Sequence, residues 1–182
     1  MTYEDLAQEL AIKKKEVDSP STQALGFDRI QAIFGYSFSA MDYNLESGGS
    51  AFNMSGIDIR ANGQLSDSAW QLEGGFKNYA KTSSGSKSAE SRILTTAIKN
   101  QNDLNAHLQY VAGVATSLHW ISAKDDLKSK NAVDFSLNLS TGIRGSLSQQ
   151  LSWGVDVNAY SPISGGTLKS GVEAVVLLSS VL

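Results

Sequence analysis

Residues 104–110 read Leu-Asn-Ala-His-Leu-Gln-Tyr, with apolar and polar side chains in strict alternation. The alternation continues along the chain, with Leu118 and Trp120 on one face and Ser117 and His119 on the other. Successive side chains of a β-strand point to opposite faces, so a period of two predicts a strand with one apolar and one polar face.

The same period runs through most of the chain from Gly26 onward, and it predicts about eight strands in all. Further copies occupy residues 30–39, 57–60, 70–77, 91–99, 133–140, 151–158 and 168–178. Turn residues predict tight connections near 62–63, 100–103 and 145–148, intermediate ones at 45–51 and 160–167, and long ones at 80–90 and 122–131. An up-and-down meander would place the longer connections at one end and the tight turns at the other.

The composition of the 182-residue chain excludes several classes of protein. Cysteine is absent, which excludes a disulfide scaffold and a structural zinc site built on cysteines. The net charge is -3 and the isoelectric point about 5.3, so no basic excess predicts a nucleic-acid partner. Charged residues make up only 18% of the chain, below the roughly 25% of an ordinary soluble domain.

The N-terminal region has a different pattern. Residues 2–18 predict an amphipathic helix with acidic residues in its first turn and three lysines near its end, followed by a Ser- and Pro-containing linker. We therefore divide the chain into a helix and linker at 1–25 and a barrel at 26–182. No secretory signal is visible at the start, so an exported protein would be represented here in its mature form.

The direction of the apolar face decides between a soluble barrel and a membrane barrel. The polar face is rich in small residues such as Gly113, Ser117 and Ser136, which suit a narrow lumen better than a water-facing surface. The charges on that face balance in sign, as a closed interior requires. The predicted network in the lumen consists of Arg29, Asp58, Arg60, Glu73, Lys77, Asp134, Arg144, Asp156, Lys169 and Glu173.

The apolar face carries aromatic residues, and several of them lie near predicted strand ends, where an interfacial girdle would sit. The predicted lipid-facing aromatic residues are Phe34, Tyr36, Phe38, Trp70, Phe76, Tyr110, Trp120, Phe135 and Trp153. We therefore expect an all-β, eight-stranded antiparallel up-and-down transmembrane β-barrel with a short N-terminal α-helix.

In this pattern, residues 26–182 resemble the small outer-membrane β-barrels of the OmpA transmembrane domain and OmpX type. The resemblance implies eight antiparallel strands, short periplasmic turns, longer surface loops and a polar interior without a wide pore. The last strand of such proteins usually ends in Phe or Trp, whereas this chain ends in Leu182.

Candidate catalytic chemistry is sparse. The two histidines, His107 and His119, fall on one predicted strand about 40 Å apart at roughly 3.3 Å per residue, too far to share a metal ion. Some eight-stranded outer-membrane barrels are lipid-modifying enzymes, and His119 with Ser117 or Ser122 is the candidate for that role. No nucleophile, base and acid stand at a fixed spacing, so we expect no enzyme activity, no cofactor and no metal.

The sequence thus predicts a bacterial outer-membrane protein that is not an enzyme and that serves as a membrane anchor or an interaction module. Its partners would be outer-membrane lipid and a periplasmic or cell-surface protein, reached through the N-terminal helix or the loops at 80–90 and 122–131. Three alternatives stay open: a lipid-modifying enzyme, a small channel, and a soluble lipocalin-like barrel. The soluble barrel would bind an apolar ligand in a pocket containing Leu108, Tyr110, Phe135 and Trp153.

Overall fold

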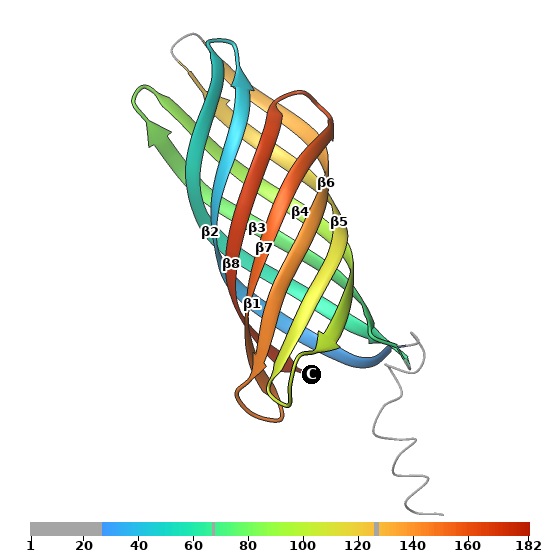
Figure 1. Ribbon diagram of the computed structural model, residues 1–182. Coiled ribbons are helices and arrows are strands. Elements are labelled where there is room, and N and C mark those ends of the chain that lie inside the picture. The colour runs from blue at the N-terminus through green and yellow to red at the C-terminus, as the bar shows by residue number, and fades with distance from the viewer. Residues whose placement is uncertain (1–26, 67, 126–127) are drawn as a thin grey trace, which may run out of the picture.

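The computed structural model describes residues 27–66, 68–125 and 128–182, which form a closed antiparallel barrel (Figure 1). Its strands are β1 (Phe27–Leu45), β2 (Gly48–Leu65), β3 (Trp70–Ser84), β4 (Lys87–Asp103), β5 (Leu108–Lys124), β6 (Ser129–Ser146), β7 (Leu151–Ser164) and β8 (Leu168–Val181). The predicted all-β class and eight-stranded up-and-down topology are confirmed. The predicted helix at 2–18 lies outside the described residues.

Each strand pairs with its sequence neighbours, and β1 pairs with β8 to close the barrel. Closure satisfies the backbone groups that an open sheet would leave unpaired at its edges. A search of the described residues for a helix long and apolar enough to cross a membrane finds none.

The connections are short at both ends, so the predicted long loops at 80–90 and 122–131 are wrong. Residues 80–84 continue β3, and β4 resumes at Lys87, which leaves a two-residue turn with Gly85 at a φ of 65°. Likewise β5 runs to Lys124 and β6 starts at Ser129. Serine, lysine and glycine in these stretches indicate exposure to water, but the backbone remains paired in strands.

The opposite end also differs in detail from the sequence prediction. Asn62 and Gly63 lie within β2 rather than in a turn, and the aromatic ring of Phe27 covers the position where a Gly63 side chain would stand. At this end β2 ends at Leu65 and β3 begins at Trp70, and the other two turns lie at 104–107 and 147–150. His107 therefore belongs to a turn and not to the same strand as His119.

We refer to the end where β1 connects to β2, β3 to β4, β5 to β6 and β7 to β8 as the hairpin end. The first and last described residues, Phe27 and Leu182, lie at the other end, where the Leu182 amide donates a hydrogen bond to the Ile30 carbonyl. The strands lean strongly relative to the barrel axis, as closure of a small barrel demands (Figure 1).

Candidate functional site

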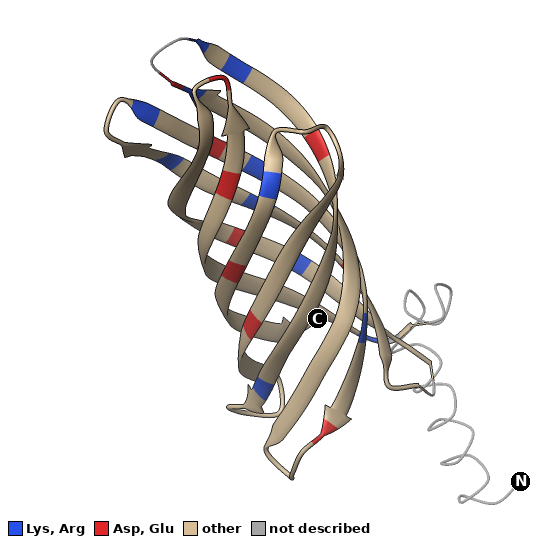
Figure 2. Ribbon diagram, turned by 45° about the horizontal axis from the view of Figure 1, so that its top comes forward, with Lys and Arg blue, Asp and Glu red and all other residues tan. Residues whose placement is uncertain are grey.

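The middle of the barrel interior holds a continuous network of buried charges. Arg60 on β2 contacts Asp58 at 2.5 Å, Glu73 on β3 at 3.1 Å and Asp156 on β7 at 2.7 Å. Lys99 on β4 contacts Glu73 at 2.8 Å and Asp156 at 3.3 Å. Basic and acidic positions thus lie beside each other on neighbouring strands along the barrel (Figure 2).

A second group of contacts extends the network toward the hairpin end. Lys77 on β3 bridges Asp58 and Glu173, and its Nζ donates a hydrogen bond to the Tyr160 hydroxyl at 2.9 Å. Glu173 on β8 also accepts hydrogen bonds from the hydroxyls of Tyr160 and Tyr79 and from the Asn158 amide. Every oxygen of this buried carboxylate is therefore engaged, as burial of a charge demands.

The network is electrically balanced. Its cations are Arg60, Lys77, Lys99 and Arg144, and its anions are Asp58, Glu73, Asp156 and Glu173. The void between these side chains has a volume of about 10 Å³, which is about the space of one water molecule. The Arg60–Asp156 contact joins residues on β2 and β7, so the cross-section at this level is filled rather than open.

Three predicted members of the lumen network lie outside it, and two of them, Arg29 and Lys169, are not in the lumen at all. Arg29 is exposed at the start of β1, next to a register shift between Phe27 and Arg29. Lys169 is exposed at the hairpin end, where the β1–β8 register also shifts, and its Nζ lies 3.6 Å from the carboxylate of Asp42. Strict alternation places both residues on the inner face, and irregular pairing at strand ends explains the error.

Lys99 is a network member that was not predicted. The alternation at 91–99 is less regular than in the other strands, because Arg92 stands among apolar residues on the face opposite Lys99. Both side chains keep the alternation, with Arg92 exposed outside and Lys99 buried inside. The odd position of Lys99 and the even position of Arg92 therefore indicate that they lie on opposite faces of β4.

Asp134 is buried on β6 but lies apart from the network. Its carboxylate accepts hydrogen bonds from the backbone amides of Thr167 and Leu168 and so fixes the start of β8. It pairs across the sheet with His119, whose ring is fully buried. The His119 Nε2 forms a hydrogen bond of 2.8 Å with the Ser136 hydroxyl.

The candidate catalytic partners of His119 are not assembled. Ser117 is hydrogen bonded to Asn138 and Thr95, and neither Ser117 nor Ser122 contacts the imidazole through a described hydrogen bond. The Tyr160 ring lies at a centroid distance of 5.3 Å from His119 and helps to enclose it. The histidine belongs to the packed interior and offers no exposed face to a substrate.

The interior changes character toward the hairpin end, where it is apolar. We call this group the hairpin-end core; it consists of Met41, Tyr43, Leu45, Phe52, Met54, Tyr79, Ala89, Ile93, Ile121, Ala123, Tyr160 and Leu168. The rings of Tyr43 and Phe52 lie 5.9 Å apart, and the Tyr43 hydroxyl points to the sulfur of Met54 at 3.6 Å. The alternation predicts a polar lumen throughout, so this apolar core corrects that expectation.

Polar contacts between turns lie at the mouth next to the hairpin-end core. The Ser47 amide donates a hydrogen bond of 3.0 Å to the carboxylate of Asp125, which is 4% exposed. Lys128 forms an ion pair of 3.2 Å with Glu46. These contacts join the β1–β2 turn to the β5–β6 connection.

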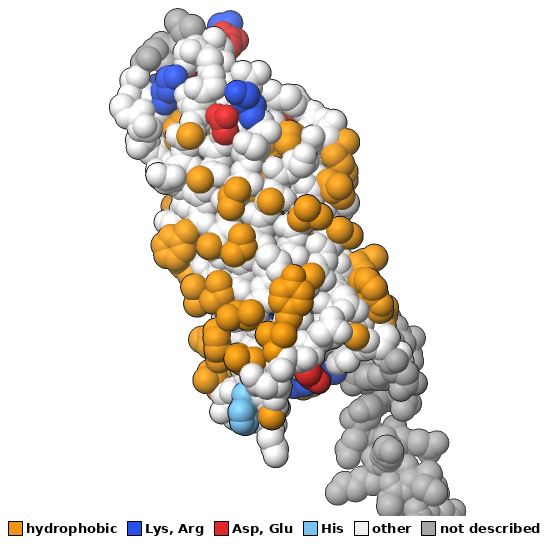
Figure 3. Space-filling view, viewed as in Figure 1, with side chains coloured by type: hydrophobic (Ala, Val, Ile, Leu, Met, Phe, Trp, Pro, Cys, Tyr) orange, Lys and Arg blue, Asp and Glu red, His pale blue; other side chains and the backbone are white. Residues whose placement is uncertain are grey.

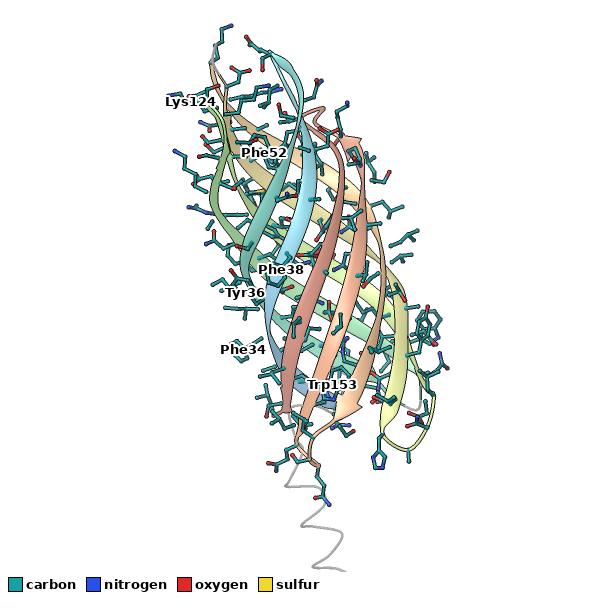
Figure 4. All side chains as sticks on the ribbon, turned by 60° about the vertical axis from the view of Figure 1, so that its left-hand side comes forward. Phe34, Tyr36, Phe38, Phe52, Lys124 and Trp153 are labelled. Carbon is teal, nitrogen blue, oxygen red and sulfur yellow. The ribbon has the colours of Figure 1, made fainter. Side chains whose placement is uncertain are left out.

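The outer wall carries the apolar side chains (Figure 3). The predicted lipid-facing residues that are exposed there are Phe34, Tyr36, Phe38, Trp70, Phe76, Tyr110, Trp120 and Phe135. Phe34, Tyr36 and Phe38 project from successive outward positions of β1 (Figure 4). Because Tyr110 and Phe135 are on the outside, they do not line the interior pocket that the soluble alternative requires.

Trp153 is the half-buried member of this set. Its indole covers Gly145 on the neighbouring strand, since a Cβ at Gly145 would lie 2.3 Å from the Trp153 Nε1. A glycine therefore makes room for the ring, and the ring in turn shields the exposed backbone.

The outer apolar surface forms a band of limited height, which we call the belt. On β5, Tyr110 and Trp120 mark its two edges. The distance between them is roughly 33 Å along the strand at about 3.3 Å per residue, or about 25 Å along the axis at a tilt of about 40°. A band of this height, with aromatic residues at both edges, matches the lipid-facing zone of an outer-membrane barrel.

The polarity of the two faces inverts where the strands leave the belt. On β1, Phe38 is exposed outside and Ser39 is buried inside, whereas further on Asp42 is on the outer side and Tyr43 is buried inside. On β1 the side chains continue to alternate without interruption, so only their chemistry changes. The belt level is apolar outside and polar inside, and the hairpin end is the reverse.

Within residues 27–66, 68–125 and 128–182, no group of three or more histidine and carboxylate side chains is arranged to hold a metal ion. The acidic residues of the network are instead engaged by lysine, arginine and tyrosine.

The architecture is similar to that of solved outer-membrane barrels. Neisserial surface protein A matches with a TM-score of 0.69 at 10% identity, covering 83% of this chain and 96% of that protein. Ail of Yersinia pestis matches with a TM-score of 0.61 at 9% identity over 85% and 98% of the two chains, and a further structure of Ail contains the heparin analogue sucrose octasulfate.

The outer membrane protein OprG of Pseudomonas aeruginosa matches with a TM-score of 0.54 at 10% identity, covering 86% of this chain and 98% of that one. No protein-family model matches the chain, and no curated protein matches it in sequence. At these identities the similarity establishes the fold, and the chain has the fold of the small eight-stranded outer-membrane β-barrels.

Proposed function

We propose that the protein is an integral outer-membrane barrel that conducts no ions and serves as an anchor for an interaction surface at its hairpin end. The observation that carries the proposal is the inversion of polarity along the strands. A soluble barrel would keep its apolar side chains inside at every level, whereas here Phe34 is 60% exposed and Arg60 is 4% exposed. Lipid is the solvent that stabilises that arrangement.

The filled interior supports an anchor rather than a channel. The balanced network around Arg60 fills the middle of the lumen, and the hairpin-end core fills the level next to it. Passage of an ion would require separation of several buried ion pairs. We therefore expect no steady conductance when the refolded protein is added to a planar bilayer, and stepwise openings in wild-type protein would refute this part of the proposal.

The hairpin end supports the interaction role. Its rim carries exposed lysines, among them Lys124 and Lys169, on strands that continue beyond the belt. Ail, which shares the fold, has been crystallised with a polysulfated sugar. By analogy, we expect the lysine rim of the present chain to bind a polyanionic partner. Binding of sucrose octasulfate to the refolded barrel tests this expectation.

The membrane assignment is tested by refolding. We expect protein that was not inserted into a membrane during expression, and was then dissolved in urea, to fold into detergent micelles or vesicles. The folded protein should migrate differently in gels before and after boiling. Recovery of a monodisperse, detergent-free β-protein without a heat-dependent band would favour the soluble barrel instead.

The lipid-modifying alternative has its own test. Lipid A extracted from cells that express the protein should have an unchanged mass spectrum, since His119 is buried and its serine partner Ser136 is inside the barrel. A modified lipid A that disappears in the variant His119→Ala would overturn the non-enzymatic assignment.

A further inference from the structure

A groove on the outer wall lies at the boundary between the belt and the hairpin end. It encloses about 450 Å³ and crosses four neighbouring strands, β3 to β6. Its lining includes Lys81, Arg92, Trp120 and Val133. The groove therefore combines cationic and apolar walls in one depression.

The strand register shows how these residues are ordered. Asn78, Arg92, Trp120 and Val133 pair in sequence across the four strands and form one row around the barrel. The next row toward the belt contains the exposed apolar residue Leu94. Arg92 and Trp120 thus stand at the edge of the apolar surface, where lipid chains would give way to headgroups.

Local backbone geometry adds a second cation to the groove. The β3–β4 register shifts between Tyr79 and Thr82, and Ala80 and Lys81 are both exposed although they are consecutive. A bulge of this kind redirects a side chain that regular alternation would place inside. Lys81 is consequently on the same outer surface as Arg92.

These two cations are not neutralised by the protein. Among the described residues, neither Lys81 nor Arg92 takes part in an ion pair or a side-chain hydrogen bond, whereas the buried lysines and arginines of the network each do. Glu90 also lines the groove, but it lies in the row beyond Arg92, paired with Ser122 and farther from the belt. A group that reaches up from the belt meets Arg92 and Trp120 first.

We propose that this groove binds the phosphorylated headgroup of an anionic lipid in the leaflet around the hairpin end. The proposal rests on the proposed membrane insertion. Arg92 and Lys81 would contact the phosphate, and Trp120 and Val133 would pack against the start of the acyl chains. Guanidinium and ammonium groups are the usual ligands of phosphate, and tryptophan is enriched at the level of lipid headgroups.

The test is native mass spectrometry of the refolded barrel in micelles, titrated with bis-phosphorylated lipid A and, separately, with zwitterionic phosphatidylcholine. Wild-type protein should retain lipid A in preference to phosphatidylcholine. The double variant Lys81→Gln/Arg92→Gln should lower the affinity for lipid A about thirtyfold, since each basic residue near an anionic lipid surface raises the affinity roughly fivefold. Glu90→Gln should raise the affinity.

The matched control for the single variant Arg92→Gln is Arg29→Gln, which removes one exposed cation at the opposite end of the barrel and should leave lipid A binding unchanged. An equal loss in Arg29→Gln and Arg92→Gln, or equal retention of the two lipids by wild type, would overturn the site. Equally tight binding of a glucosamine phosphate without acyl chains would assign the groove to a soluble anion and also overturn it.

Failure of the site can be told from failure of membrane insertion by the heat-dependent gel shift. If wild-type protein shows no such shift, the membrane assignment itself fails. If wild type and Lys81→Gln/Arg92→Gln both show the shift but bind lipid A equally, only the lipid site is refuted.

Discussion

The middle of the barrel and its hairpin end are built from the same eight strands, yet their interiors follow opposite rules. At the middle level the inner side chains are charged, and Arg60 alone contacts three carboxylates. At the hairpin end they are apolar, and Phe52 and Ile93 are packed as in a soluble protein. The solvent outside each level explains the difference, because lipid accepts apolar residues on the outer wall and water does not.

The largest effect should come from removing the centre of the charged level. Arg60→Ala leaves Asp58, Glu73 and Asp156 with an excess of buried negative charge, and loss of one partner in such a group costs about 3–5 kcal/mol. Urea titration of the barrel in vesicles, followed by tryptophan fluorescence, measures the change. Arg92→Ala, on the outer wall, should stay within about 0.5 kcal/mol of wild type.

A charge placed on the outer wall should locate the boundary between the two levels. Ile98→Lys puts an ammonium group on the exposed belt face of β4 and should lower the free energy of unfolding in vesicles by about 2–4 kcal/mol. Asn53→Lys, on the outer side of β2 near the hairpin end, should lower it by only about 0–1 kcal/mol. Equal losses for the two variants would mean that the belt extends over the hairpin end.

Two glycines test how tightly the charged level is packed. A Cβ at Gly113 would lie 2.3 Å from the Ile98 carbonyl oxygen and 2.7 Å from the Lys99 Cα, both backbone atoms, so Gly113→Ala should destabilise the barrel by about 1–3 kcal/mol. Gly74→Ala meets nothing within 4 Å and should be neutral or slightly stabilising. The same urea titration applies, and a harmless Gly113→Ala would show that the lumen is looser than these distances indicate.

The smallest effect should come from removing one methyl group from the inner or from the outer face of β4. Ile93→Val in the hairpin-end core should cost about 0.5–1.5 kcal/mol, because neighbouring side chains cannot fully close the space. Ile98→Val on the belt should cost less, since mobile lipid chains refill the volume. A larger loss at Ile98 would contradict the assignment of a packed core to the hairpin end.

The fold could be predicted because side-chain alternation is a local signal that each strand repeats. The connections could not, because strands such as β3 continue into water beyond the belt, and polar residues like Lys81 and Ser84 resemble a loop in composition. The hydrogen bonds that keep these residues in a strand come from β4 and are invisible in the segment itself.

The site was predictable in part for the same reason. Asp58 and Glu73 lie in regularly alternating parts of their strands, so the alternation alone predicts that their side chains face the interior. Arg29 and Lys169 stand beside register shifts, where parity is unreliable. The hairpin-end core could not be predicted, because Tyr43 and Phe52 occupy the same inward-facing positions of their strands as the polar lumen residues. Alternation alone does not show that water, not lipid, surrounds the barrel at this level.

The pairing of the buried charges has a consequence for how the barrel forms. Arg60 pairs with Asp156, and Lys77 pairs with Glu173. In each pair the partners are 96 positions apart in the sequence, so neither pair can form until the later strands have joined the sheet. A half-assembled sheet in the membrane would hold these charges without partners and would be unstable there. Neutrality of the lumen is therefore a property of the closed cylinder alone, and it favours insertion and closure as one cooperative event.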